Sequence, residues 1–241
     1  KTMLSRRRTV GALFAFGFAL YANQLCYAQT VQITNAGTAT VLQMLASAFV
    51  MLYVCVTLRR APRIRETIGL LLALLAALFI ATQGDIRTLD VPADGLVWGL
   101  LTALSTAVYI IVPKRCGLFE RYGSMPVVGT GMLLGALFAL PVYLLQGNTL
   151  VDVATVLAAF GGFEWFVFLG GLVVVGTICG YGLYLHGVAI VGSVKGSLLG
   201  AIEPVSATVL AALWLGTAFT GYDLAGLVLM CVMVAFVTSD E

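Results

Sequence analysis

Charged side chains are scarce in this sequence. They make up 10% of its 241 residues, whereas hydrophobic residues make up 61% and the mean hydropathy is +1.04. A soluble globular domain usually carries about 25% charged residues, because its surface faces water. The composition therefore argues against a soluble domain and indicates a protein embedded in a lipid bilayer.

Long apolar runs are what the sequence does contain. A transmembrane helix needs about 20 predominantly apolar residues to cross about 30 Å of hydrocarbon. Eight such segments fit between charged or Gly/Asn-rich breaks, which predicts an all-α polytopic transmembrane helix bundle with no separate soluble domain. Residues 150–160 are predicted to form a short helix at the membrane surface. The predicted spans are 9–28, 36–58, 67–83, 95–113, 125–146, 163–190, 196–216 and 221–238.

Clusters of metal-binding or catalytic residues are lacking. The five cysteines are odd in number and show no Cys-x-x-Cys spacing, and His186 is the only histidine. Disulfide and zinc frameworks are therefore poorly supported, and we expect no metal and no other cofactor. An enzyme is not expected either, because no pair of aspartates shares a span and no serine lies in a Gly-x-Ser-x-Gly motif.

Lysine and arginine are distributed asymmetrically over the predicted loops. Twelve of the thirteen fall on one side of the membrane, with only Arg87 opposite. Cytoplasmic loops carry such an excess, so both ends of this chain are predicted to be cytoplasmic. A patch that binds anionic lipid or nucleic acid is the alternative, but the basic residues lie at span ends, which favours the topological interpretation. We expect no nucleic-acid partner.

The first three predicted spans recur as spans six to eight. The sequence GFALY at 17–21 resembles GYGLY at 180–184, and a single further offset pairs Ser47 with Pro204 and Gly69 with Gly226. The predicted topology gives the two copies opposite directions across the membrane. Inverted repeats of this kind are common in secondary transporters, whose substrate site lies where the repeats meet.

The second copy carries a recognisable series of elements. It reads YGLYLHGVAIVGSVKGSLLGAIEPVSATVLAALWLGT from Tyr181 to Thr217 and continues as GLVLMCVMVAF from Gly226. This series, with its small residues before Glu-Pro, resembles the EamA-type transporters of the drug/metabolite transporter superfamily. Thr217 departs from the acid that is common in the family, and Ser47 departs from a proline that is usual in the first half.

The resemblance implies a fold and a mode of action. It implies a ten-helix inverted-repeat fold of five plus five helices, in which this chain starts at the third helix. Residues 1–90 would then be a partial first repeat with three helices, and residues 91–241 a second repeat with five. It also implies transport of small metabolites, amino acids among them, and leaves the substrate and the direction open.

Glu203 is the one acid placed deep inside a predicted span, and Pro204 follows it. At about 1.5 Å per residue, Glu203 lies about 12 Å beyond Lys195. A charge at such a depth costs about 2.5 to 3.5 kcal/mol on insertion scales, so it needs a partner or a cavity. Pro204 has no N–H for the carbonyl of Gly200, which predicts a kink. We interpret the pair as an ionisable ligand beside a hinge; the alternative is a fixed hydrogen bond between helices.

Other polar residues of the predicted spans are candidates for the same site. His186 is predicted to pair with Glu203 or to titrate during transport, although a packing role is the commoner one for a single histidine. Uncharged polar residues of the first copy and a tyrosine of the second could line the same cavity. They are Tyr21, Asn23, Gln43 and Tyr184. Glycines four residues apart, such as Gly131 with Gly135 and Gly95 with Gly99, predict close helix packing.

The sequence thus predicts a secondary transporter in the cell (plasma or inner) membrane. It is expected to move a small-molecule substrate by alternating access, as an exchanger or with a proton. A membrane channel, or a structural membrane protein without transport, is the alternative, although no ring of repeated charge marks a channel. The oligomeric state is left open, with a homodimer among the candidates.

Overall fold

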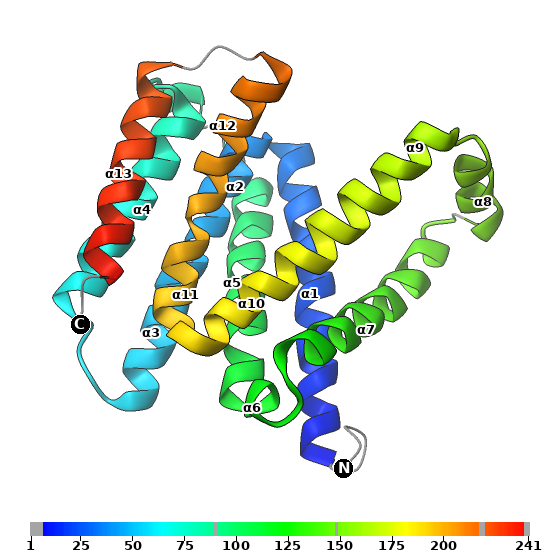
Figure 1. The fold of residues 1–241 in the computed structure, drawn as a ribbon, viewed down its shortest axis with the longest axis horizontal. Helices are drawn as coiled ribbons and strands as arrows, with labels where there is room; N and C mark the ends of the chain where they lie inside the picture. The colour runs from blue at the N-terminus through cyan, green and yellow to red at the C-terminus, as the bar shows by residue number, and fades with distance from the viewer. Residues whose placement is uncertain (1–6, 89–90, 148, 217–219, 239–241) are drawn as a thin grey trace. The chain divides into compact units, whose positions relative to one another are not determined.

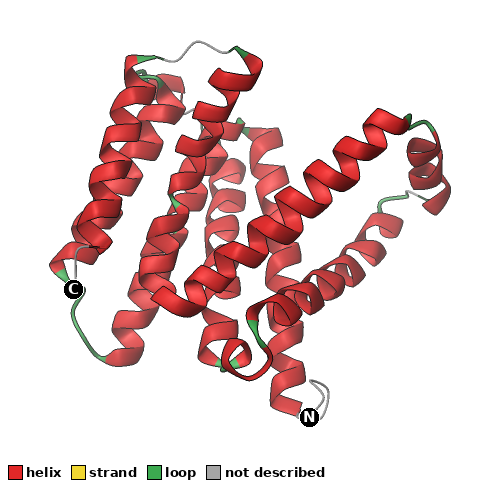
Figure 2. Cartoon of the chain, viewed as in Figure 1, coloured by secondary structure: helices red, strands yellow, loops and turns green. Residues whose placement is uncertain are grey.

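The computed structural model describes residues 7–88, 91–147, 149–216 and 220–238, and the described residues form helices joined by short loops, without a strand (Figure 2). Their order along the chain is shown in Figure 1. The elements are α1 (Arg7–Ile33), α2 (Ala36–Met44), α3 (Ala46–Leu58), α4 (Ile64–Thr82), η2 (Ile86–Thr88), α5 (Ala93–Arg115), α6 (Leu118–Tyr122), α7 (Ser124–Leu145), α8 (Leu150–Ala158), α9 (Gly162–Phe166), η3 (Val167–Cys179), α10 (Gly180–Val191), α11 (Ser193–Gly200), α12 (Ile202–Leu215) and α13 (Gly221–Thr238). The all-α prediction is confirmed.

Six helices in the described part of the chain are long and apolar enough to cross a membrane. They are 7–33, 36–58, 64–82, 93–115, 124–145 and 162–191, and they coincide with the first six predicted spans. The seventh predicted span is divided by a turn at Ala201, and the apolar part of α13 covers only Gly221–Phe236. The count of eight spans therefore stays a prediction. The segment 150–160 contains α8, a separate short helix without buried residues.

The chain divides into two compact units that cut across the predicted repeats. Unit 1 contains residues 1–21 and 112–190, and unit 2 contains residues 22–111 and 191–241. Helices α1 and α5 each contribute to both units. Because these units follow contacts and not sequence order, the division into residues 1–90 and 91–241 stays a prediction.

Unit 1 contains a close contact between α1 and α7. A Cβ atom added to Gly17 would lie 2.5 Å from Leu134 Cβ and 2.9 Å from the carbonyl oxygen of Gly131. Phe16, which is fully buried, likewise leaves no room for a side chain at Gly131. The backbones can approach this closely only because glycine has no side chain, as in other membrane helix pairs. The packing role predicted for Gly131 is thus confirmed.

The glycines of a second helix in unit 1, which begins as η3, show no such close contact at Gly171 and Gly180. The π-helix η3 continues into α10, and none of its 13 residues is buried. A Cβ atom at Gly171 would meet nothing within 4 Å, and one at Gly180 would meet only the carbonyl oxygen of Val175 in the same stretch. The repeat alignment pairs Gly180 with Gly17, so two equivalent glycines have different surroundings in the described part of the chain. Long π-helices are rare, since single turns are the usual form.

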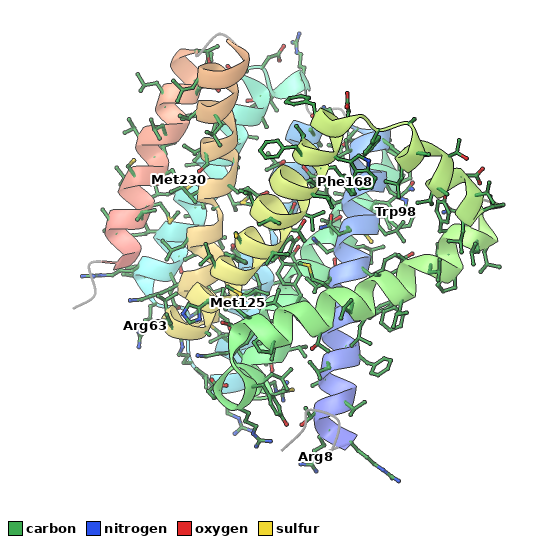
Figure 3. All side chains as sticks on the ribbon, turned by 45° about the vertical axis from the view of Figure 1, so that its right-hand side comes forward. Arg8, Arg63, Trp98, Met125, Phe168 and Met230 are labelled. Carbon is green, nitrogen blue, oxygen red and sulfur yellow. The ribbon has the colours of Figure 1, made fainter. Side chains whose placement is uncertain are left out.

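Unit 2 is built on the antiparallel pair α4 and α13. The guanidinium carbon of Arg65, near the start of α4, lies 5.8 Å from the ring centroid of Phe236, near the end of α13. At the opposite end of the pair, a Cβ atom on Gly226 would lie 2.7 Å from Ile80 Cγ1. The two helices therefore run in opposite directions along their whole contact, as Figure 1 also shows. Met230 of α13, labelled in Figure 3, is fully buried in this unit.

The end of α4 is tied to the start of α13 by polar side chains. Gln83 closes α4 in a left-handed conformation (φ 49°), and its Nε2 donates to Asp223 Oδ1 at 2.7 Å. Thr220 donates to Gln83 Oε1 through its hydroxyl and to Asp223 Oδ2 through its N–H at 2.9 Å. Gly84 (φ +85°) lies against the ring of Tyr222 with no room for a side chain. The carboxylate of Asp223 is buried and accepts hydrogen bonds from Gln83 at the end of α4 and from Thr220 just before α13.

Gly17→Ala tests the close packing of α1 on α7. The added methyl group cannot fit beside Leu134, so we expect the helices to separate at a cost of about 1 to 3 kcal/mol and the melting temperature in detergent to fall. Gly11→Ala is the matched control, because it lies on the same helix with nothing within 4 Å of the added Cβ. The control should melt at the wild-type temperature or slightly above it, since alanine favours helices. Equal melting temperatures of the two variants would contradict the contact.

Candidate transport site

Two helices of unit 2 are interrupted at a single residue. Between α2 and α3, the N–H of Leu45 donates to the carbonyl oxygen of Leu42 at 3.1 Å, three residues back instead of four. Between α11 and α12, the N–H of Ala201 donates in the same way to Leu198 at 3.0 Å. Each interruption is therefore a tight turn. The carbonyl four residues before it loses the N–H that would be its donor in a continuous helix.

The kink predicted from Pro204 is present, but it lies three residues before the proline. Pro204 lies in the first turn of α12, where its missing N–H costs little because those groups have no partner within the helix. The break itself falls at Ala201 (φ −65°, ψ −7°). No proline or glycine accompanies the break at Leu45, so no local signal in the sequence predicts it.

The breaks in the two copies are connected by a side chain. Ser47, two residues after Leu45, donates its hydroxyl to the carbonyl oxygen of Ser197 at 3.0 Å. This is the carbonyl whose usual helical donor, the N–H of Ala201, has turned to Leu198. Both serines are buried, each with 5% of its surface exposed. The connection was missed at the level of sequence, because it depends on how α3 packs on α11.

Glu203 follows the second break, two residues after Ala201. It is exposed and lies in the first turn of α12. A carboxylate is favoured at the start of a helix, where backbone N–H groups and the helix dipole present positive charge. The break therefore places Glu203 where the start of a helix favours a negative charge. Gln43 lies half-buried in α2, two residues before the first break.

Asn23 takes part in a buried helix contact. Its Oδ1 accepts a hydrogen bond from the hydroxyl of Thr106 in α5 at 2.6 Å, and only 3% of Asn23 is exposed. Asn23 belongs to unit 2, as do Gln43 and Glu203. Thr106 is a partner that sequence reasoning missed, because side-chain hydroxyls on apolar helices more often bond to their own backbone.

The remaining candidates belong to unit 1. His186, exposed on α10, has its Nδ1 2.8 Å from the hydroxyl oxygen of Ser124 at the start of α7. Tyr184 and Tyr21 are half-buried on α10 and α1. The sequence did not predict Ser124 as the partner of His186, although its place after Gly123 marks a helix start. The predicted pairing of His186 with Glu203 stays a prediction.

A lysine closes the end of α10 in the same unit. Lys114 donates from Nζ to the carbonyl oxygen of Ala189 and lies 3.7 Å from a carboxylate oxygen of Glu120. A cation is favoured at the end of a helix, where carbonyl groups lack partners. Met125, labelled in Figure 3, leaves no room for a side chain at Gly182, so the start of α7 is held against α10.

Comparison with known proteins identifies the family. Residues 1–82 and 93–239 match the model of the EamA-like transporter family. The chain belongs to this family. It is 33% identical over 218 residues to the "uncharacterized inner membrane transporter YicL" of Salmonella typhimurium, a match that covers 90% of this chain and 69% of that protein. The resemblance that rests on the Glu203–Pro204 element is thus confirmed.

A solved crystal structure shows the same fold. It aligns with a TM-score of 0.75 at 17% identity and covers 94% of this chain and 75% of the other. Family and fold together make the EamA-like chain a multi-pass membrane protein of the drug/metabolite transporter type. The family is one of transporters.

A double-mutant cycle tests the bond between Asn23 and Thr106. Asn23→Ala and Thr106→Val each remove one partner, and we expect the pair to be coupled by about 0.6 kcal/mol, at most about 1.7, as for other hydrogen bonds between membrane helices. The measurement is the free energy of unfolding in bicelles for the wild type, the two single variants and the double variant. Additive effects of the two substitutions would show that the bond contributes nothing.

Proposed function

We propose that the EamA-like chain acts as a secondary transporter that moves a small metabolite, such as an amino acid or a related compound, by alternating access. The proposal includes an inverted repeat of five plus five helices with its boundary near residue 90, in the gap between the two matched stretches. It also includes eight spans with both ends of this chain in the cytoplasm of the cell. The required partners are the bilayer and the substrate, and the proposal holds for a monomer or a homodimer.

The directions of equivalent helices support this proposal. In unit 2, α4 and α13 are antiparallel, and the sequence repeat pairs them with each other. The broken helices α2–α3 and α11–α12 also run in opposite directions in Figure 1. An inverted repeat requires these relations, because each element of one copy must cross the membrane opposite to its counterpart.

The paired breaks are the observation that carries the proposal. Transporters with inverted repeats often use discontinuous helices, whose ends point at substrate or coupling ions near the midplane. Here α11 has eight residues, so the break lies about 12 Å from its start. The exposed Glu203 in the first turn after this break is suited to bind a cationic group or a proton.

Glu203→Gln tests the carboxylate. Loss of a charge-assisted hydrogen bond costs about 1.5 to 3 kcal/mol, so we expect about a 10- to 100-fold loss of transport efficiency and the loss of its dependence on a pH gradient. The measurement is uptake by vesicles that contain the purified protein, with substrates found by a metabolite screen. Glu164→Gln is the matched control, since Glu164 is also exposed in the first turn of a helix.

The outcomes separate the alternatives. Saturable uptake that is stimulated by substrate on the opposite side indicates a carrier, whereas flux that does not saturate indicates a channel. Normal pH-dependent uptake by Glu203→Gln would remove the carboxylate from the coupling mechanism.

A further inference from the structure

We propose that Ser47 is a positioning residue that holds the break between α11 and α12 and so couples the two broken helices. This inference rests on the proposed function, because it assigns the breaks a part in the conformational change. Ser47 itself need not touch the substrate. Its partner is a backbone group, the carbonyl of Ser197.

The hydrogen bond of Ser47 is unusual for a serine in a membrane helix. Such hydroxyls commonly donate to a carbonyl in the preceding turn of their own helix, as Ser105 does to Leu101 at 2.8 Å. Ser47 instead donates to another helix, and its acceptor lies 150 residues away in the sequence. The hydroxyl of Ser197 is not involved in this bond, since it donates to Val194 at 2.9 Å.

Two donors compete for this carbonyl. In a continuous helix, the carbonyl of Ser197 would accept from the N–H of Ala201. In the broken helix that N–H bonds to Leu198, and the hydroxyl of Ser47 takes its place. A carbonyl left without either donor would be buried and unpaired, which is costly inside a membrane bundle.

These two arrangements exclude each other. The hydroxyl of Ser47 favours the broken helix, and the N–H of Ala201 favours the continuous one. A group that interacts differently with two states shifts the equilibrium between them. A movement of α3 that withdraws Ser47 therefore favours a continuous α11–α12, and straightening of α11–α12 releases α3. This link moves Glu203, which follows the break by two residues.

Ser47→Ala tests the inference by hydrogen exchange of backbone amides. Without the hydroxyl, the carbonyl of Ser197 recruits the N–H of Ala201, and the weak point of the helix is lost. Hydrogen bonds between membrane helices are worth enough to change an equilibrium about 3- to 18-fold. We therefore expect amides in the segment 198–206 to exchange about 3 to 18 times more slowly than in the wild type. The measurement uses the purified full chain in lipid nanodiscs, without substrate.

The direction of the effect distinguishes positioning from stabilisation. If Ser47 merely stabilised the fold, its removal would speed exchange, so faster or unchanged exchange in 198–206 would overturn the inference. Ser105→Ala is the matched control, because it removes a buried hydroxyl that bonds within its own helix and should leave this segment unchanged. Ser47→Cys keeps the side chain's size while weakening the donor, and it should give an intermediate rate even if Ser47→Ala gives little folded protein.

Transport measurements separate the two proposals. In vesicles, Ser47→Ala should slow exchange of the metabolite found by the screen while its KM stays within about twofold of the wild type, because the substrate's own contacts are kept. If the wild type transports and Ser47→Ala matches Ser105→Ala in both measurements, the inference fails and the proposed function stands. If slow amide exchange is found in Ser47→Ala but the wild type transports nothing, the proposed function fails alone.

Discussion

A backbone carbonyl or N–H group inside a membrane must find a partner within the protein, and this constraint explains the form of unit 2. Helices satisfy it automatically, which is why the described residues are helical. Each break creates a group that needs a substitute donor. At Ala201 the substitute is the hydroxyl of Ser47, which comes from the other copy of the repeat. The break and the packing of α3 on α11 are therefore one feature and not two.

Close packing of small residues stabilises the other helix contacts. Apolar side chains gain little from leaving the lipid, because lipid tails are as apolar as they are. Gly17 and Gly131 allow α1 to pack closely against α7, and Gly226 of α13 leaves room for the side chain of Ile80. Polar contacts then fix the register at particular points. Asn23 with Thr106 is one such contact, and the buried carboxylate of Asp223 with Gln83 is another. Apolar contact alone would allow the helices to slide.

The sequence predicts those features that depend on local chemistry. Runs of apolar residues located six helices to within a few residues, and the Glu203–Pro204 element identified the family. Pro204 predicted a kink close to the one observed, because a proline has no N–H to donate to the turn before it and so favours a helix start over a helix interior. The break at Leu45 has no such cause in its own neighbourhood. The partners of Asn23, Ser47 and His186 were also hidden, because each partner lies on another helix and is chosen by packing.

The antiparallel seam of α4 and α13 has a consequence for the path of a solute. One end is covered by Arg65 over Phe236, and at the other end Ile80 packs against Gly226 and Gln83 donates a hydrogen bond to Asp223. A metabolite cannot pass between two helices that pack against each other and are held together at both ends. A solute that crosses the membrane through this protein therefore passes beside the α4–α13 pair and not between its two helices.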